Sequence, residues 1–357
     1  MHGRLLLTAL PAWLGVLMLS GTLLSCTQAE SHVPRPAPTY RAITLDARRA
    51  PEPEVLPALR DLGVSHITLI PFGFQPALHV PELRMNPDAR WYSESDTGIR
   101  TLAAQADTLG MGVIIKPHIW VGRYDVSGQT RADIGFDDEA SWQQWEAQYR
   151  TFMLHYADLA AEVEADLLVV GTELARAARE RPAFWRGLIA EVRTRYEGPL
   201  TYAANWYAEY DLIPFWADLD YIGVQAYFPI SDDEGPTDEA LRAGWKPHCE
   251  ALGALSAQVD RPVLFTEFGY RSVRYAAAEP WRWPSRDEVG TGVLDLDLQA
   301  RLYDAFFAVP WQEPWLAGII VWKWHPTEEG QRPHRSIAFT PQGKPAEAVM
   351  GRAFNAR

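Results

Sequence analysis

The sequence predicts an α/β protein whose main part is a single-domain (β/α)8 TIM barrel, spanning residues 41–357. Eight strand-like runs alternate strictly with eight helix-like stretches, at roughly thirty to forty residues per unit, as in barrels of this class. The helix-to-strand connections are short, whereas four longer connections follow strands. These lie at residues 73–97, 121–138, 229–237 and 271–295. Because barrel active sites are built from the loops that follow the strands, this asymmetry predicts one functional face.

The strand-like runs are apolar and rich in β-branched residues, as buried parallel strands are. They lie at residues 42–47, 66–72, 111–120, 166–174, 199–206, 221–228, 262–270 and 316–325. The helix-like stretches lie at residues 54–62, 98–109, 139–164, 183–196, 211–217, 238–258, 296–308 and 345–354. A doubly wound open sheet is the main alternative. No Gly-rich phosphate loop follows the first strand, which disfavours the nucleotide-binding version of that fold.

Two strand-like runs end in the same Thr-Glu pair, which puts Glu173 and Glu267 at the carboxyl ends of their strands. Glycoside hydrolysis needs two carboxyl groups, because one must donate a proton while the other attacks the sugar or activates water. We therefore expect Glu173 and Glu267 to be catalytic. The structural alternative is that each glutamate belongs to an ion pair, for instance with Lys116 or Arg271.

The ends of the other strands also carry polar and aromatic side chains. A buried polar group costs free energy unless it is hydrogen-bonded, so such a rim either forms an internal network or binds a hydroxyl-rich ligand. For the set as a whole we favour the ligand. The candidate substrate-binding residues are Lys116, His118, Trp120, Asn205, Trp206, Gln225, Tyr227, Tyr270, Trp322 and Trp324.

Tryptophan is abundant in this chain, with 15 residues of this type. A flat apolar ring face complements the C–H face of a pyranose, although a Trp can equally fill the core of a large domain. Trp322 and Trp324 are two residues apart on one strand and are expected to share a face. The sequence does not decide which of them reaches the sugar.

The charge and the absence of several motifs narrow the function classes. The formal net charge of −13 argues against nucleic acid and anionic polymers as partners and suits a neutral polysaccharide or oligosaccharide. The chain has no Gly-x-Ser-x-Gly elbow, no phosphate loop and no His-Glu-x-x-His motif. We expect a monomer that needs no metal and no organic cofactor.

The N-terminus has the features of an exported bacterial lipoprotein. A basic residue precedes an uncharged run, and Leu-Leu-Ser-Cys26 resembles the lipobox in which the Cys is acylated. We expect a signal peptide over 1–25 and a Pro-rich tether over 26–40. Lipid on Cys26 would hold the protein on the periplasmic or extracellular side of a membrane. An uncleaved transmembrane anchor is the alternative.

Four segments resemble the endo-β-1,4-mannanases of glycoside hydrolase family 113. They are Gly-Thr-Glu-Leu at 171–174, Phe-Trp-Arg-Gly-Leu-Ile-Ala-Glu-Val-Arg at 184–193, Leu-Thr-Tyr-Ala-Ala-Asn-Trp at 200–206 and Thr-Glu-Phe-Gly-Tyr at 266–270. The resemblance implies a retaining (β/α)8 glycosidase in which Glu173 is the general acid/base and Glu267 is the nucleophile. The clan to which this family belongs commonly has Asn before the acid/base, where this chain has Thr172. The contact to the sugar 2-hydroxyl would then come from Asn205 or His118.

These observations together favour a retaining glycoside hydrolase that cleaves a β-1,4-linked hexose polysaccharide, with β-mannan as the favoured substrate. A catalytically silent carbohydrate-binding lipoprotein is the alternative from another class, although a binding module has no need of paired carboxylates. The same enzyme class could also act on a β-glucan, a xylan or a cell-surface glycan. Transglycosylation would use the same residues, and the sequence does not distinguish endo- from exo-action.

Overall fold

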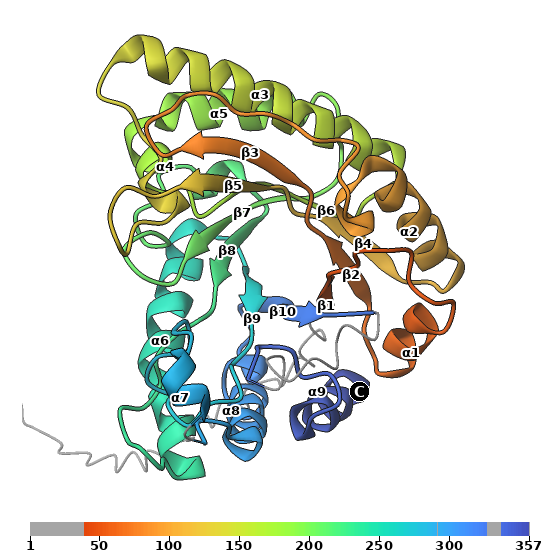
Figure 1. The fold of residues 1–357 in the computed structure, drawn as a ribbon, viewed down its shortest axis with the longest axis vertical. Coiled ribbons are helices and arrows are strands. Elements are labelled where there is room, and N and C mark those ends of the chain that lie inside the picture. Colours follow the sequence, from red (N-terminus) through yellow and green to blue (C-terminus); the bar gives the residue numbers. More distant parts are fainter. Residues whose placement is uncertain (1–38, 291, 327–336, 357) are drawn as a thin grey trace, which may run out of the picture. The chain divides into compact units, whose positions relative to one another are not determined.

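The computed structural model describes residues 39–290, 292–326 and 337–356. The expected signal peptide, Cys26 and the tether up to residue 38 lie outside the described residues. The described chain forms a closed barrel of eight parallel strands with helices around it, which confirms the predicted fold class (Figure 1). Among the described helices, none is both long enough and apolar enough to cross a membrane.

All neighbouring strands of the barrel run parallel, and β1 closes it by pairing with both β2 and β10. In chain order the barrel strands are β1 (Tyr40–Leu45), β2 (His66–Leu69), β4 (Gly112–Ile115), β6 (Leu167–Thr172), β7 (Leu200–Asn205), β8 (Tyr221–Gln225), β9 (Val263–Phe268) and β10 (Leu316–Trp324). The α-helices are α1 (Val55–Asp61), α2 (Asp96–Thr108), α3 (Glu139–Glu162), α4 (Ala175–Glu180), α5 (Pro182–Val192), α6 (Asp238–Val259), α7 (Arg286–Gly290), α8 (Leu296–Ala308) and α9 (Pro345–Asn355). Short 3-10 helices are η1 (Tyr92–Glu94), η2 (Arg131–Asp133), η3 (Trp216–Asp218) and η4 (Pro310–Gln312).

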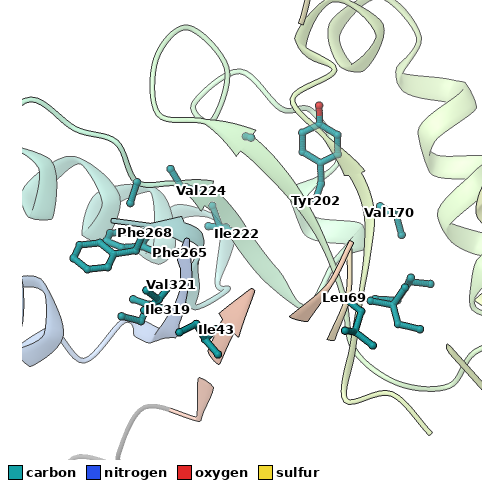
Figure 2. Close-up of a cluster of buried hydrophobic side chains, with 14 of the residues drawn as sticks. Ile43, Leu69, Val170, Tyr202, Ile222, Val224, Phe265, Phe268, Ile319 and Val321 are labelled. Atoms are coloured by element: carbon teal, nitrogen blue, oxygen red, sulfur yellow. The ribbon is translucent and has the colours of Figure 1, made fainter. Parts of the chain in front are cut away.

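In six of the barrel strands, β1, β4, β6, β7, β9 and β10, neighbouring residues belong to two separate buried clusters, as the two-residue period of a strand requires. The smaller cluster fills the barrel interior and includes Ala42 and Leu264. The larger cluster, part of which Figure 2 shows, includes Ile43 and Phe265 and packs the barrel against the helices, so we call it the outer cluster. Packing in these two clusters holds the strands in place. The candidate site lies at the carboxyl ends of the strands.

The second and third predicted strands, at 66–72 and 111–120, are each broken by a proline. Strand β2 ends two residues before Pro71 and β4 ends two residues before Pro117, where the ladder cannot continue because proline has no N–H to donate. The chain then resumes as β3 (Phe72–Ala77) and β5 (His118–Arg123), which pair in parallel as a separate two-stranded sheet. We call this sheet the β3–β5 ribbon; Figure 1 shows it beyond the carboxyl ends of β2 and β4.

The prediction of a helix at residues 211–217 is wrong. The segment forms turns that lead into η3, and Pro214 explains this, because proline disfavours the helical conformation of the residue that precedes it. Helices α4 and α7 were not predicted; both are short. The other predicted helices are present, with ends that differ by a few residues.

Candidate active site

A cavity of about 620 Å³ opens among the carboxyl ends of the barrel strands and contains both predicted catalytic glutamates. Its lining residues are His118, Thr130, Arg131, Glu173, Asn205, Trp206, Tyr207, Tyr227, Glu267, Trp281, Trp322 and Phe339. Several of these residues come from the long connections that the sequence predicted to form the functional face.

A bulge at the end of β9 turns Glu267 into the cavity. Val224 of β8 pairs with Phe265, but the next residue, Gln225, pairs with Glu267, so β9 contains one extra residue. Phe265 and Phe268 both lie in the outer apolar cluster, although strict alternation would place them on opposite sides. The extra residue thus changes the side to which the chain points, as bulges near active sites commonly do.

A comparable irregularity positions Glu173. On β6, Val169 pairs with Thr201 and Thr172 pairs with Ala203, so β6 again has one residue more than its partner. Glu173 follows with a left-handed backbone, at φ 54°. The Glu173 amide N donates to the Ala203 carbonyl oxygen at 2.8 Å, which fixes the backbone at the point where the side chain leaves the strand.

Two side-chain donors, one of them fully buried, hold the Glu267 carboxylate. Lys116 Nζ donates to Oε1 at 2.6 Å and Tyr227 Oη donates to Oε2 at 2.7 Å. Lys116 is fully buried, and its other two donors reach Gln225 Oε1 at 2.9 Å and the Thr266 carbonyl oxygen at 3.1 Å. Burial lowers the pKa of Lys116, and the Glu267 carboxylate opposes that shift. The ion pair considered from the sequence therefore exists, and it lies at the wall of the cavity.

Glu173 has a different environment. Its Oε1 accepts a hydrogen bond from Gln225 Nε2 at 2.6 Å, and its Oε2 lies 3.3 Å from Arg131 Nε. Burial raises the pKa of Glu173, and the negative charge of Glu267 raises it further, whereas Arg131 opposes the rise. A carboxyl group with a raised pKa beside an anchored carboxylate is the arrangement that general acid catalysis requires.

Five of the predicted substrate-binding residues line the cavity: His118, Asn205, Trp206, Tyr227 and Trp322. Lys116 and Gln225 lie behind them, because both are buried and bind the two glutamates. Trp206 stacks on Trp281 with 5.0 Å between ring centroids, so the two rings form an aromatic wall.

Three predicted residues do not reach the cavity. Tyr270 is fully buried and packs against Phe268 in the outer cluster, so its predicted contact with substrate is wrong. Trp324 also lies in that cluster. Between Val321 and Trp324, β10 has one residue more than β1. Trp322 and Trp324 therefore lie on different faces of the strand, contrary to the expectation that they share one. Trp120 is 62% exposed on the β3–β5 ribbon, outside the cavity lining.

Glu209 is a site residue that the sequence reasoning missed. It is fully buried, and its Oε2 accepts hydrogen bonds from both the backbone N and Nδ2 of Asn205, each at 2.7 Å. Its Oε1 accepts from Tyr202 Oη at 2.6 Å, and that same hydroxyl accepts from the Leu174 amide N at 2.6 Å. Glu209 thus connects Asn205 to the residue that follows Glu173. Its position four residues after Asn205 was the signal available in the sequence.

Arg131 and Trp281 were missed as well, although both lie in connections that were predicted to form the site. Neither connection has a regular pattern from which a particular side chain could be chosen. Within the described part of the chain, no three His, Cys, Asp or Glu side chains form a group that could hold a metal ion.

The closed parallel barrel, with two carboxyl groups in one cavity at the carboxyl ends of its strands, defines a (β/α)8 glycoside hydrolase. The model of Glycoside Hydrolase Family 113 matches residues 47–344. The chain belongs to glycoside hydrolase family 113, as the four sequence segments indicated.

Solved structures of this family agree with the assignment. A GH113 β-1,4-mannanase is 26% identical with a TM-score of 0.74, and the match covers 89% of this chain and 99% of that chain. The GH113 β-mannanase AaManA from Alicyclobacillus acidocaldarius, in complex with ManMIm, is 29% identical with a TM-score of 0.73 and coverage of 88% and 97%. A GH5_18 protein from Bifidobacterium longum subsp. infantis, 16% identical with a TM-score of 0.54 and coverage of 88% and 77%, shares only the fold. A comparison with curated proteins gave no match.

Proposed function

We propose that this glycoside hydrolase is a retaining enzyme that cleaves β-1,4-linked hexose chains, with β-mannan as its substrate. The observation that carries the proposal is the pair of glutamates, which share one cavity but have different environments. Glu267 accepts hydrogen bonds from Lys116 and Tyr227, which stabilise a carboxylate. Burial raises the pKa of Glu173, which favours a protonated carboxylic acid.

In the first step, Glu267 attacks the anomeric carbon and Glu173 protonates the leaving oxygen, so that a glycosyl-enzyme ester forms as the glycosidic bond breaks. In the second step, the ionised Glu173 takes a proton from water, and the water oxygen displaces Glu267 from the anomeric carbon. Two inversions at the same carbon retain its configuration. Gln225 contacts both Glu173 and Lys116, so it keeps the two carboxyl groups in a fixed relation.

The choice of mannan rests on the two family members solved as β-mannanases, which are 26% and 29% identical to this chain. The cavity lining is compatible with a neutral sugar chain, because Trp206, Trp281 and Trp322 offer ring faces for stacking. We further propose that the protein acts as a monomer, since both glutamates and the aromatic wall come from one chain.

We also propose that the polysaccharide extends from the cavity over the β3–β5 ribbon. Phe74 and Trp120 pair directly across the ribbon and are both exposed, by 38% and 62%. Phe72 contacts both Trp120 and His118, with ring centroids 6.3 Å and 5.3 Å apart, so the aromatic surface continues to the cavity wall. Exposed neighbouring rings on a ribbon are a suitable platform for further sugar units.

The N-terminal features lead us to propose that the mature enzyme begins at Cys26 and is held on the outer side of a membrane by lipid. The support is the lipobox-like sequence and the Pro-rich tether that precedes the barrel. Cys26→Ser should release the protein from the membrane fraction with its glycosidase activity intact. If the variant stays in the membrane fraction, the anchor is an uncleaved helix.

Product analysis tests the enzymatic proposal. The purified protein and its Glu267→Ala variant are incubated with β-1,4-linked manno-, gluco- and xylo-oligosaccharides, and the configuration of the first product is followed by NMR. We expect cleavage of the manno series, with β-anomers formed first and with loss of activity in the variant. First formation of α-anomers would disprove retention. Binding of the manno series without cleavage would instead support the silent-binder alternative.

A further inference from the structure

Arg271 is a buried cation that lies behind the cavity wall. Its side chain follows β9 and is only 1% exposed, and Nε and Nη1 have no hydrogen-bond partner among the described residues. The catalytic glutamates are paired with Lys116 and Arg131 instead, so the pairing with Arg271 that the sequence allowed does not occur. Burial lowers the pKa of the Arg271 guanidinium to about 9. A buried charge with unsatisfied donors costs stability, which indicates a role other than folding.

Aromatic rings surround this guanidinium where a carboxylate would be expected. Arg271 Cζ lies 3.2 Å from the ring centroid of Trp283 and 4.1 Å from that of Phe339. Its Nη2 donates to the Trp281 carbonyl oxygen at 3.5 Å, a long hydrogen bond. A guanidinium suits such contacts, because it is planar and more weakly hydrated than an ammonium. Arg271 therefore joins the turn that carries both tryptophans to the segment before α9.

Both sides of this contact belong to the cavity wall. Phe339 lines the cavity, and its ring centroid is 5.1 Å from that of Tyr227. Trp281 also lines the cavity, where its ring stacks on Trp206 as half of the aromatic wall. Trp281 is 45% exposed and Trp283 is 61% exposed, so burial in the core does not hold either ring in place. The position of the wall therefore depends on the contacts that the turn makes with the barrel.

Lys344 joins the same two parts of the chain at a different place. Its Nζ donates to Ser272 Oγ at 2.9 Å and to the Ala338 carbonyl oxygen at 2.8 Å. These two acceptors are the sequence neighbours of Arg271 and Phe339. Lys344 thus holds the base of the connection 271–295, whereas Arg271 reaches the turn with the two tryptophans.

We propose that Arg271 is a positioning residue that holds Trp281 in the aromatic wall, where the ring supports a sugar unit of the substrate. The inference rests on the proposed function, because the wall matters for activity only if a sugar chain occupies the cavity. A guanidinium offers a flat face to Trp283 and a donor to the Trp281 carbonyl at the same time, which neither an apolar side chain nor a lysine can do. Arg271 is bonded to neither glutamate in the described structure, so it should affect binding and not the chemical step.

Steady-state kinetics on mannohexaose tests this role. Arg271→Met keeps most of the side-chain length but removes the plane and the charge. It should raise KM roughly three- to tenfold, the contribution of one stacked ring, and leave kcat within about twofold. Trp281→Ala should have the same effect, and the double variant should be no worse than Trp281→Ala alone, because both changes remove one interaction. Arg271→Lys should not restore KM, since an ammonium has no flat face.

Two further variants keep the test independent of folding. Lys344→Met is the matched control, because it removes a buried cation from the same segments without touching the turn, and it should leave KM unchanged. Trp283→Ala removes the Arg271 contact from the exposed side and should reproduce the rise in KM. Additive effects in the double variant, a wild-type KM for Trp283→Ala, or a lower kcat at unchanged KM for Arg271→Met would overturn the proposal.

Limited trypsin digestion separates this inference from the enzymatic proposal, since it needs no substrate. Arg282 is a cleavage site within the turn, and Arg271→Met should be cut there several-fold faster than wild type, because the turn opens more often. Cleavage at Arg123, in another connection, should not change. Faster cleavage at Arg282 in a protein that cleaves no mannoside would refute the proposed function and leave the positioning role standing. Equal cleavage of variant and wild type would overturn the inference even if the enzyme is active.

Discussion

At the scale of single residues, the two glutamates differ because their neighbours differ. Glu267 receives two donors and is joined to a buried lysine, whereas Glu173 receives one amide and lies near a guanidinium at the cavity wall. Gln225 connects the two environments, since its amide oxygen accepts from Lys116 and its nitrogen donates to Glu173. Removing the charge of a residue close to Glu173 should therefore change the pKa of Glu173.

Arg131→Met is predicted to shift the pH profile of the enzyme. Arg131 opposes the rise in the pKa of Glu173, so its removal should raise that pKa further. A general acid must be protonated, and activity falls as the pH rises through its pKa. The alkaline limb of kcat/KM should accordingly move to higher pH, as pH–rate profiles on a mannooligosaccharide can show.

Arg123→Met is the matched control for this prediction. Arg123 is on the same connection, but its side chain is 69% exposed and faces Asp125 at the end of the ribbon. Its removal should leave the alkaline limb in place. A limb that shifts equally in both variants would mean that the effect is a general one of net charge and not of the contact with Glu173.

Glu209 is predicted to make stability depend on pH. Burial raises its pKa from 4.5 to about 7 in the folded protein. Between these values the folded state binds more protons than the unfolded state, so this group destabilises the fold as the pH rises through the window. Glu209→Gln removes the titration, and the free energy of unfolding of the variant relative to wild type should rise by up to about 3 kcal/mol across the window, since one pKa unit is about 1.4 kcal/mol.

Urea denaturation at several pH values measures this difference, and Glu52→Gln provides the control. Glu52 is exposed in the connection before α1, so its substitution controls for the loss of one carboxyl group outside the site. A flat difference for Glu209→Gln would show that Glu209 has an ordinary pKa.

At the scale of elements, the sequence pattern predicted where strands lie but not how they end. The two Thr-Glu pairs led to the two glutamates, because a buried apolar run that stops at a carboxylate is a strong signal. The extra residues in β6, β9 and β10 left no such signal, since a bulge is set by the pairing with the neighbouring strand. Tyr270 and Trp324 were misplaced for that reason.

We predict that the β3–β5 ribbon contributes to the binding of long substrates only. Trp120→Ala should lower kcat/KM roughly three- to tenfold on β-mannan or mannohexaose, because a stacked aromatic ring contributes about 0.5–1.5 kcal/mol. Mannotriose should be cleaved at the wild-type rate if it occupies the cavity alone. The control is Leu212→Ala, an exposed apolar residue between β7 and η3, which should affect neither substrate. An equal loss on short and long substrates would argue against a separate platform.

At the scale of the whole molecule, the alternation of strands and helices favoured the closed barrel over the doubly wound open sheet, and the structure has the closed barrel. The contents of the cavity were less predictable. Arg131, Glu209 and Trp281 come from connections without periodicity, and the contacts of Arg131 and Trp281 join parts of the chain that are distant in sequence. Barrel closure itself depends on one pairing of this kind, between the first and last strands.

That closure predicts a specific weak point at Gly318 of β10. Its φ is 147°, and a Cβ there would lie 2.1 Å from the Tyr40 carbonyl oxygen of β1, which is backbone and cannot swing away. Gly318→Ala should therefore lower the free energy of unfolding by roughly 1–3 kcal/mol, the usual cost of forcing extra atoms into a packed core.

Gly187 in α5 is the matched control, because a Cβ there meets no atom within 4 Å. Gly187→Ala should stabilise the protein by roughly 0.5–1 kcal/mol. Thermal and urea unfolding of both variants measure the two effects. Equal stability of the Gly318 variant and wild type would mean that β1 and β10 can separate without loss, and the barrel would then not need this closure to fold.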